Sequence, residues 1–396
     1  MGIHGIKTFF ETCITKHDLS EYKNKIVLID GMYVLYKQCI GRREFGYDHC
    51  KSNGASVNHL QSIFTFTCCL LEKNIIPVFV FDGYYPEEKS VTVKRRSDNK
   101  IKSQSKCNSI ADKSSEEYIR HFKRSLHISS SNIADCKALL LSMGVCVIQA
   151  QMEADSQLAA LSNEFKKEIA GIITEDSDVL IYGGTKILKE FSFRTNSVIQ
   201  LDRLEMLDFL LKKSNTIRKQ YNMTEFTEFT QNNLIDFGII MGTDYKSKND
   251  KIIYYAGLSN AEKREKIFEM FVINDLSVVK LIENIKNINI GETLKGNKHL
   301  YNVPADFITS YIQIKNIYLE HDVINKSEIK LILKTPNITN IINILCNQND
   351  FEKHFVDKKI KYIVDSYNTF AGIIPYKTKA SQWEHFAKKN KYRHVY

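Results

Sequence analysis

Residues 169–178 read Ile-Ala-Gly-Ile-Ile-Thr-Glu-Asp-Ser-Asp, an apolar run that ends in three acids within four positions. The apolar run predicts a strand covered on both faces, because such strands carry a near-continuous hydrophobic sequence. Asp176 and Asp178 follow at the carboxyl end of the strand, where open α/β sheets bind ligands. Two neighbouring carboxylates repel each other unless a positive group, usually a metal ion, offsets their charge. This stretch alone favours a solvated acidic turn over a metal site, so the other strand ends decide between the two.

Two further strands are predicted to end in the same way. Residues 25–30 and 75–82 are apolar runs whose last residues, Asp30 and Asp82, are each followed by glycine. Residues 56–73 carry apolar side chains at helical spacing, and the order strand, helix, strand implies a right-handed crossover and a parallel pair. Shorter strands are expected at 145–148 and 186–191, and helices at 133–143, 151–161 and 234–241. The predicted fold class is therefore α/β, with a mostly parallel central sheet flanked by helices.

The composition is that of a globular protein with a sizeable core. The chain has 396 residues, of which 43% are hydrophobic and 26% charged, enough for one large domain or two. No apolar run reaches membrane-spanning length and the N-terminus lacks the apolar region of a signal peptide, so an intracellular, soluble and unanchored protein is expected. Nine cysteines occur without a Cys-x-x-Cys pair, which argues against a disulfide framework and against a thiolate zinc site.

The charge is positive and unevenly distributed. The net charge is +9 and the isoelectric point is about 8.9, which favours a polyanionic partner. Residues 84–127 hold eleven lysines or arginines against six acids, with serine and asparagine between them. This segment is inserted between two predicted strands, close to their acidic ends. It is interpreted either as a solvated loop or exposed helix, or as an arch that faces a substrate.

Seven acids stand at the ends or beginnings of predicted strands and helices. They are Asp30, Asp82, Glu153, Asp155, Asp176, Asp178 and Asp244. No His or Cys stands among them, and an all-oxygen ligand set suits hard cations such as Mg²⁺ or Mn²⁺ rather than zinc. Seven carboxylates exceed what one magnesium ion needs. They suit two ions roughly 3.5–4 Å apart, the arrangement that holds the attacking and leaving oxygens during phosphodiester hydrolysis.

These motifs resemble those of the flap endonuclease family of structure-specific 5′ nucleases, which includes the XPG-type repair nucleases. Met-Gly-Ile-His-Gly-Ile at 1–6 resembles the opening of that family, and Val-Phe-Val-Phe-Asp-Gly at 78–83 resembles its N-region signature. Glu-Ala-Asp at 153–155 stands where the family has Glu-Ala-Glu, and residues 174–178 and 242–245 resemble its other two metal-binding motifs. The resemblance implies a PIN-like 5′ nuclease fold with an inserted gateway and cap arch and a helical C-terminal region.

The same resemblance implies roles for individual residues. Those that would hold a first Mg²⁺ are Asp30, Asp82, Glu153 and Asp155, and those that would hold a second are Asp176, Asp178 and Asp244; Mn²⁺ is expected to substitute. Lys89 and Arg96 match gateway residues that reach the scissile phosphate, where fixed cations stabilise developing charge. The residues expected to contact DNA are Gly2, Tyr36, Arg43, Arg120, Lys123, Arg124 and Gly242. Glu175 matches no ligand of the family and is expected to be structural.

Three departures from the family pattern bear on DNA binding. Phe66 stands where the phosphate-contacting helix of the family has a basic residue. Residues 248–258 replace a Gly-Ile-Gly helix-turn-helix with at best a degenerate version, so altered duplex contacts and no K⁺ site are expected. Residues 381–386 do not reproduce a sliding-clamp box. The short tail and the Asn-, Ile- and Lys-rich composition resemble the poxvirus branch of the family most, which implies the host cytoplasm; for other branches the nucleus is expected.

Four segments are expected along the chain: an N-terminal nuclease part (1–97), a helical gateway and cap arch (98–130), an internal nuclease part (131–245) and a helical C-terminal region (246–396). The expected activity is metal-dependent 5′ flap endonuclease and 5′–3′ exonuclease cleavage of branched or nicked DNA, in replication, repair or recombination. The alternatives are a DNA-binding recombination or assembly factor with vestigial nuclease activity, and a 5′ exonuclease directed at RNA. The expected partners are branched DNA and replication or recombination proteins, with no membrane.

Overall fold

The computed structural model describes residues 9–243, 245, 252–254, 258–295, 301–331 and 333–370. Two predicted site residues, Gly2 and Asp244, lie outside these ranges, as do most of residues 246–257 and the segment from 371 onward. The described residues include six of the seven predicted ligand acids.

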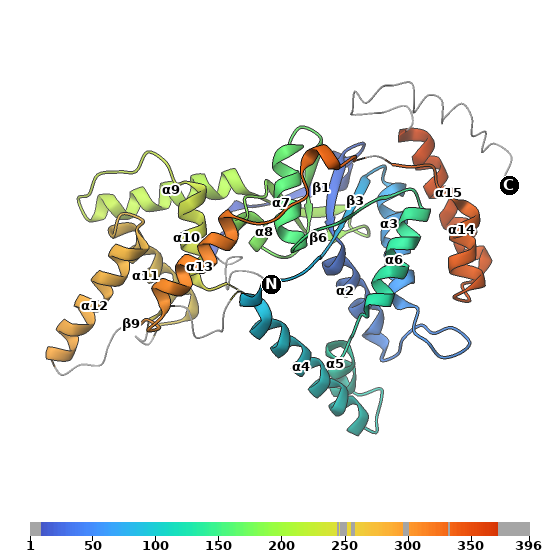
Figure 1. The fold of residues 1–396 in the computed structure, drawn as a ribbon, viewed down its shortest axis with the longest axis horizontal. Coiled ribbons are helices and arrows are strands. Elements are labelled where there is room, and N and C mark those ends of the chain that lie inside the picture. The colour runs from blue at the N-terminus through green and yellow to red at the C-terminus, as the bar shows by residue number, and fades with distance from the viewer. Residues whose placement is uncertain are drawn as a thin grey trace.

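A seven-stranded sheet forms the centre of the molecule (Figure 1). Its strands are β1 (Ile14–Asp18), β2 (Ile26–Asp30), β3 (Ile76–Phe81), β4 (Cys146–Gln149), β5 (Ile169–Ile173), β6 (Lys186–Ser192) and β7 (Ser197–Asp202). They lie in the order β1-β7-β6-β5-β2-β3-β4. The strands from β6 to β4 are parallel, whereas β7 and β1 join antiparallel at one edge. The predicted mostly parallel sheet is confirmed, and each strand that the sequence predicts is present.

The chain leaves the middle of this sheet in two directions. From β2 it proceeds to β3 and β4 on one side, and from β5, which pairs with the other edge of β2, it proceeds to β6. Because crossovers between parallel strands are right-handed, the helices of the two halves cover opposite faces of the sheet. The carboxyl ends of β2 and β5 therefore form a topological switch point, the place where open α/β sheets bind ligands.

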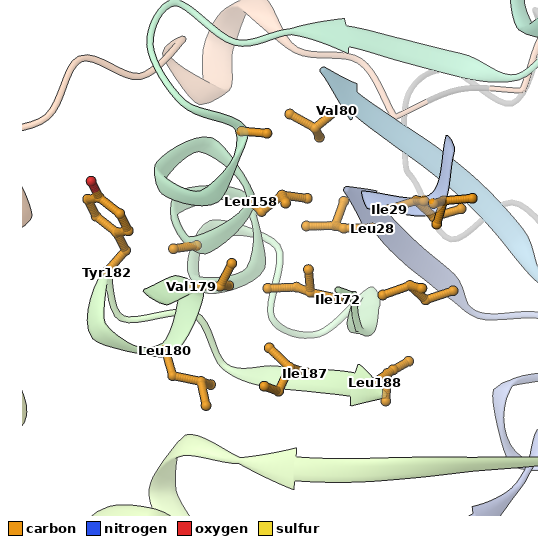
Figure 2. Packing of buried hydrophobic residues seen from close by; sticks show 14 of the residues in the cluster. Leu28, Ile29, Val80, Leu158, Ile172, Val179, Leu180, Tyr182, Ile187 and Leu188 are labelled. Carbon is orange, nitrogen blue, oxygen red and sulfur yellow. The ribbon is translucent and has the colours of Figure 1, made fainter. Parts of the chain in front are cut away.

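Two groups of helices cover the sheet. One group is α2 (Gly31–Arg42), α3 (Asn58–Glu72) and α6 (Ser130–Ser142), and the other is α7 (Ala154–Glu164) with the short α8 (Asp178–Ile181). Figure 2 shows the core between the sheet and α7, where Leu28, Val80, Ile172 and Leu158 are fully buried. Burying each of these side chains contributes about 1.5–3 kcal/mol. This packing fixes the strands, and with them the acids at their ends.

The basic segment between β3 and β4 is helical. It contains α4 (Ser90–Ser109) and α5 (Glu116–Arg124), which pack against each other and project away from the sheet (Figure 1). Most of the basic residues of this segment lie on helices and not in a loop, which agrees both with an exposed helix and with an arch that faces a substrate. The boundary expected at residue 97 falls within α4. The helices α4 and α5 are called the arch from here on.

The C-terminal half adds two helical groups at opposite ends of the molecule (Figure 1). The first contains α9 (Arg203–Gln220), α10 (Gln231–Met241), α11 (Asn260–Ile273), α12 (Val278–Leu294) and α13 (Phe307–Leu319), with the small ribbon of β8 (Ile253–Tyr254) and β9 (Tyr301–Asn302). The second contains α14 (Ile338–Ile342) and α15 (Lys353–Phe370), and α15 packs on α3. No helix in the described ranges is both long and apolar enough to cross a membrane.

A long connection between α13 and α14 ties these two groups to the sheet. The backbone N–H of Ile324 donates to Oε1 of Gln157 on α7 at 2.8 Å. Further along, the Lys334 N–H donates to the carbonyl of Gly144, just before β4, at 2.7 Å. Gly144 has a φ of +79°, and a Cβ there would lie 2.0 Å from the Lys334 carbonyl oxygen. Glycine is therefore required for this close approach.

Candidate active site

The two strand ends at the switch point are joined by hydrogen bonds. Oδ2 of Asp30, the last residue of β2, accepts from the Thr174 hydroxyl at 3.1 Å, and Oδ1 accepts from the Tyr33 backbone N–H at 2.9 Å. The Thr174 hydroxyl oxygen accepts from the Asp176 backbone N–H at 3.0 Å, and Asp176 accepts from the Asp178 backbone N–H at 3.1 Å. These bonds shape the turn after β5, and all three aspartates are buried.

The end of β3 is joined in turn to the start of α7. Asp82 follows β3, and its carboxylate accepts a hydrogen bond from the Ala154 backbone N–H at 2.8 Å. Gly83 lies so close to the loop before α7 that a Cβ would be 2.2 Å from the carbonyl oxygen of Gln151. Only glycine allows this approach, which brings Asp82 near Glu153, the N-cap residue of α7.

The six described acids form one cluster of negative charge. Burial, and then repulsion from Asp82, raises the pKa of Asp30 to about 7. Asp82 keeps an exposed surface, but the protein around its carboxyl shields it from water and raises its pKa, and the charges of Glu153 and Asp176 add to this rise. The pKa of Asp155 is raised well above its usual value by burial and by repulsion from Asp176 and Asp30. Carboxylates that raise one another's pKa lack compensating positive charge, so a cation bound among them would be stabilised.

Lys89 enters this cluster from the base of the arch. It follows β3 by eight residues, and its buried ammonium donates to Oε1 of Glu153. Burial disfavours the ammonium, but the carboxylates of Glu153 and Asp155 outweigh burial and raise the pKa of Lys89. Asp178 adds to the same shift, which places it within electrostatic reach of the ammonium. Arg96, the other predicted catalytic cation, lies on α4 with an exposed side chain.

An all-oxygen cluster of this kind has the donor chemistry that Mg²⁺ and Mn²⁺ prefer. Within the described residues, no three His, Cys, Asp or Glu side chains are arranged to hold one ion. Protein donors occupy some of the carboxylate oxygens, as Thr174 does on Asp30 and Ala154 does on Asp82. The donor set nevertheless fits a hard cation, because the carboxylates outnumber the ammonium groups of Lys89 and Lys137 that interact with them. The seventh predicted ligand, Asp244, lies outside the described residues.

Tyr36, which is predicted to contact DNA, lies on α2 beneath the arch. The ammonium of Lys100 on α4 donates to the Tyr36 hydroxyl at 2.8 Å and lies 4.6 Å from the centre of its ring. Lys100 is half-buried, whereas Lys94, Arg95 and Arg96 on the same helix are exposed. Sequence reasoning did not single out Lys100 as a contact of Tyr36, since the two residues are 64 positions apart.

Arg43, predicted to contact DNA, is directed into the protein. Its guanidinium donates to both oxygens of Asp48 and, at 2.9 Å, to the backbone carbonyl of Phe122 on α5. It also lies 4.2 Å from the centre of the Phe122 ring, a cation–π contact. Arg43 therefore joins the end of α2 to the arch. The sequence analysis predicted a contact with DNA for this residue and no such contact within the protein.

The three predicted phosphate contacts of α5 differ in exposure. Arg120 and Arg124 are exposed and four residues apart, so they lie on one side of the helix. Lys123 is half-buried and its ammonium lies 3.3 Å from Oε1 of Glu44. Two of the three are thus available to a polyanion on the surface of the arch.

Three other predicted positions have local explanations. Phe66, where a basic residue was expected, is buried and packs edge-on against Phe193 and Phe191. Gly242 ends α10 with a φ of +98°, a conformation that favours glycine. Glu175 accepts hydrogen bonds from the Tyr33 hydroxyl, Lys37 and the Glu190 backbone, which agrees with the structural role expected for it. Gly2 lies outside the described residues.

Comparison with known proteins identifies the family. Residues 1–103 match the XPG N-terminal domain and residues 144–244 match the XPG I-region. Together these matches cover just over half of the chain and contain all seven acids. The flap endonuclease 1 of Danio rerio is 25% identical over 405 residues, covering 98% of this chain and 96% of the relative. That of Glycine max is 28% identical over 371 residues, covering 92% and 86%.

Solved structures share the fold. The catalytic core of Rad2 in complex with a DNA substrate superposes with a TM-score of 0.62 at 19% identity, over 91% of this chain and 100% of that chain. The Holliday junction-resolving enzyme GEN1, in complex with product DNA and a Mg²⁺ ion, superposes with a TM-score of 0.55 at 16% identity, over 93% and 78%. The fold and the acid cluster define a structure-specific nuclease. The chain belongs to the XPG-type flap endonuclease family, as its motifs predict.

Proposed function

We propose that this chain hydrolyses DNA phosphodiester bonds at 5′ flaps, nicks and related branched junctions, as a Mg²⁺-dependent endonuclease and 5′–3′ exonuclease. The observation that carries the proposal is the cluster of six acids at the switch point of the sheet, with the Lys89 ammonium inside it. The relatives named flap endonuclease and the DNA substrate bound to Rad2 support it.

Two Mg²⁺ ions are proposed for each active site. The residues that would hold the first are Asp30, Asp82, Glu153 and Asp155, and those that would hold the second are Asp176, Asp178 and Asp244. Bound Mg²⁺ would supply an activated water and stabilisation of the departing oxygen. The number of carboxylates supports two ions rather than one, since a single Mg²⁺ is usually bound by one or two carboxylates and keeps several waters.

Lys89 and Arg96 are proposed to bind the scissile phosphate. Lys89 is the N-cap residue of α4, and Arg96 lies seven residues further on, within that helix. Their fixed positive charges would stabilise the charge that develops on the phosphate oxygens in the transition state. Tyr36 is proposed to hold the adjacent base by stacking, a contact that every base can make.

A vestigial nuclease that only binds DNA is the second candidate. Phe66 favours it, because this side chain is buried among Phe191 and Phe193 and offers no charge to a phosphate. The acid cluster argues against it, since a module that only binds DNA has no need of six carboxylates gathered at one site. The arch and its exposed arginines would serve either function.

The decisive experiment replaces one buried acid without changing its size. Asp178→Asn should abolish Mg²⁺-dependent cleavage of a labelled 5′-flap DNA, while the affinity for that DNA, measured in EDTA, stays within a few-fold of the unmodified chain. The matched control is Asp208→Asn, an exposed acid of α9 whose carboxylate lies 2.6 Å from the Lys212 ammonium. This control should cleave normally.

The substrate class is tested in the same assay. A panel of 5′ flap, nicked, gapped and four-way DNA, together with a 5′-phosphorylated RNA, should be cleaved best at the 5′ flap. Full cleavage by Asp178→Asn would exclude the proposed active site. Tight binding without cleavage of any substrate by the unmodified chain would establish the vestigial nuclease instead.

A further inference from the structure

A buried pair of tyrosines lies directly behind Glu153. The Tyr245 hydroxyl donates to Oε2 of Glu153, and it also contacts the Tyr182 hydroxyl. Both tyrosine rings are buried, and the Lys89 ammonium lies 5.3 Å from the centre of the Tyr245 ring. Figure 2 shows Tyr182 at the end of α8, with its hydroxyl pointing away from the apolar core. The two oxygens of Glu153 are thus held from two sides, by Lys89 and by Tyr245.

The chemistry of the groups fixes the direction of these hydrogen bonds. A tyrosine hydroxyl has one proton, and an ionised carboxylate can only accept. Since Tyr245 gives its proton to Glu153, Tyr182 must donate to the Tyr245 oxygen. The result is a directed chain, Tyr182 to Tyr245 to Glu153, in which each bond polarises and strengthens the next.

This series of hydrogen bonds links the segments that carry the acids. Tyr182 follows Asp178 by four residues, and Tyr245 is adjacent to Asp244 in the sequence. Glu153 belongs to the other proposed set of ligands. Tyr318 of α13 closes the cluster, with its ring 4.8 Å from that of Tyr182 and 5.4 Å from that of Tyr245. The hydrogen bonds from Tyr182 through Tyr245 therefore connect Glu153 to the two segments that carry the proposed ligands of the second metal ion.

We propose that Tyr245 and Tyr182 are positioning residues, which orient the Glu153 carboxylate as a ligand for the divalent cation. The inference rests on the proposed function, in which Glu153 holds a metal ion. Hydrogen bonds from neighbouring side chains to a ligating group fix its orientation, and their loss typically lowers metal affinity by 10- to 100-fold. Neither tyrosine touches the substrate in this proposal, and both act through Glu153.

Tyr318 provides a control for the loss of a buried hydroxyl. Its hydroxyl is buried and has no hydrogen-bond partner among the described residues. Tyr318→Phe thus removes the same atom from the same aromatic cluster without breaking a hydrogen bond that the structure describes. Removing an unpaired buried hydroxyl is close to neutral, because no partner is left unsatisfied.

The test measures Mn²⁺ binding to the metal-free protein without DNA, from the electron paramagnetic resonance signal of free Mn²⁺. Tyr245→Phe should raise the Kd for Mn²⁺ by about 10-fold or more. Tyr182→Phe, which leaves the bond from Tyr245 to Glu153 in place, should raise it by a smaller factor. Tyr318→Phe should bind like the unmodified chain. Near-UV circular dichroism and the midpoint of thermal unfolding establish that each variant is folded.

Two outcomes would overturn the inference. The first is a folded Tyr245→Phe that binds Mn²⁺ as tightly as the unmodified chain. The second is an equal loss of affinity in Tyr318→Phe, since packing of the rings and not the hydroxyl chain would then be responsible. If Tyr245→Phe does not fold, Tyr182→Phe carries the test alone. Failure of the proposed function is distinct, because the unmodified chain would then neither bind Mn²⁺ nor cleave flap DNA.

Discussion

The Arg43 guanidinium donates two hydrogen bonds of 2.7 Å, one to each carboxylate oxygen of Asp48. Asp48 also accepts from the Asn58 side chain at 2.7 Å, at the start of α3. With its further contacts to Phe122, Arg43 connects the ends of α2 and α3 to α5 of the arch. Paired hydrogen bonds of this geometry are stronger than those between neutral groups. The arch is therefore anchored to the helices beneath it within the protein itself.

Arg43→Ala is expected to loosen this anchor. Loss of the charged hydrogen bonds removes about 1.5–3 kcal/mol of local stabilisation, so hydrogen exchange of the α5 amides should accelerate by about 10- to 100-fold. Exchange followed by mass spectrometry measures this directly. The control is Arg120→Ala, an exposed residue of α5, which should leave the protection of that helix unchanged. Unchanged protection of α5 in Arg43→Ala would mean that the helix is held by its other contacts.

The exposed arginines of α5 are expected to dominate the salt dependence of DNA binding through the arch. Each phosphate contact that is lost lowers the slope of log K against log salt by about 0.7–0.9, so Arg120→Ala with Arg124→Ala should lower it by about 1.4–1.8. Lys123→Ala should change it less, because that ammonium already lies beside Glu44. Binding of 5′-flap DNA at several salt concentrations gives the slope.

The matched control for the arch removes two lysines of α9. Lys212→Ala with Lys219→Ala deletes the same charge from side chains that are 75% and 67% exposed. An equal fall of the slope in this control would show a diffuse charge effect. An unchanged slope in the arginine variant would exclude the arch from the DNA contacts.

The stability of the metal-free protein is expected to fall as the pH rises through the titration of Asp30. Burial and then the charge of Asp82 raise the pKa of this carboxyl from 3.8 to about 7. The native state therefore binds more protons than the unfolded state between about pH 4 and pH 7, and the free energy of unfolding decreases over that window. The decrease should be on the order of a few kcal/mol, since one pKa unit corresponds to about 1.4 kcal/mol.

Urea unfolding in EDTA at pH 5 and pH 7.5 measures this decrease. Asp30→Asn cannot ionise, so it should flatten the dependence and stabilise the metal-free protein at pH 7.5 relative to the unmodified chain. Asp18→Asn is the control at an exposed strand end, where hydrogen bonds from Ser20 lower the pKa of the carboxyl. A pH dependence that survives in Asp30→Asn would assign it to another acid of the cluster.

Much of the frame that carries the acids could be predicted from local patterns. The strands β2, β3 and β5 are buried along nearly their whole length, so their sequences are apolar without alternation and easy to find. The acids at the ends of these strands are found in the same way, because each stands at or just after the end of an apolar run. The edge strand β1 reads Ile-Thr-Lys-His-Asp and has a largely solvated surface, so it carries no such signal. Its pairing with β7 depends on residues nearly two hundred positions away.

Contacts between distant segments account for the features that the sequence did not reveal. Arg43 carries the same charge whether it faces DNA or Asp48, and its contact with Phe122 joins residues that are 79 positions apart. The contact of Tyr245 with Glu153 spans 92 residues and follows no helical or strand period. Six of the seven acids that the resemblance to known nucleases singled out lie close together in the described residues. The resemblance did not predict which uncharged side chains hold them.

Lys89→Met should separate the chemistry of cleavage from the binding of DNA. The Lys89 ammonium lies within the acid cluster, and its raised pKa keeps it charged throughout the neutral range. Removing one fixed charge that stabilises a transition state typically costs about 100- to 1,000-fold in kcat. The Kd for 5′-flap DNA, measured in EDTA, should change little, because a single buried cation contributes little to the overall attraction of the polyanion. The control is Lys94→Met, the same substitution at an exposed position of α4 five residues further on, which should cleave at the normal rate. Equal losses in both variants would indicate that the charge of α4 as a whole is needed, and normal cleavage by Lys89→Met would remove Lys89 from the active site.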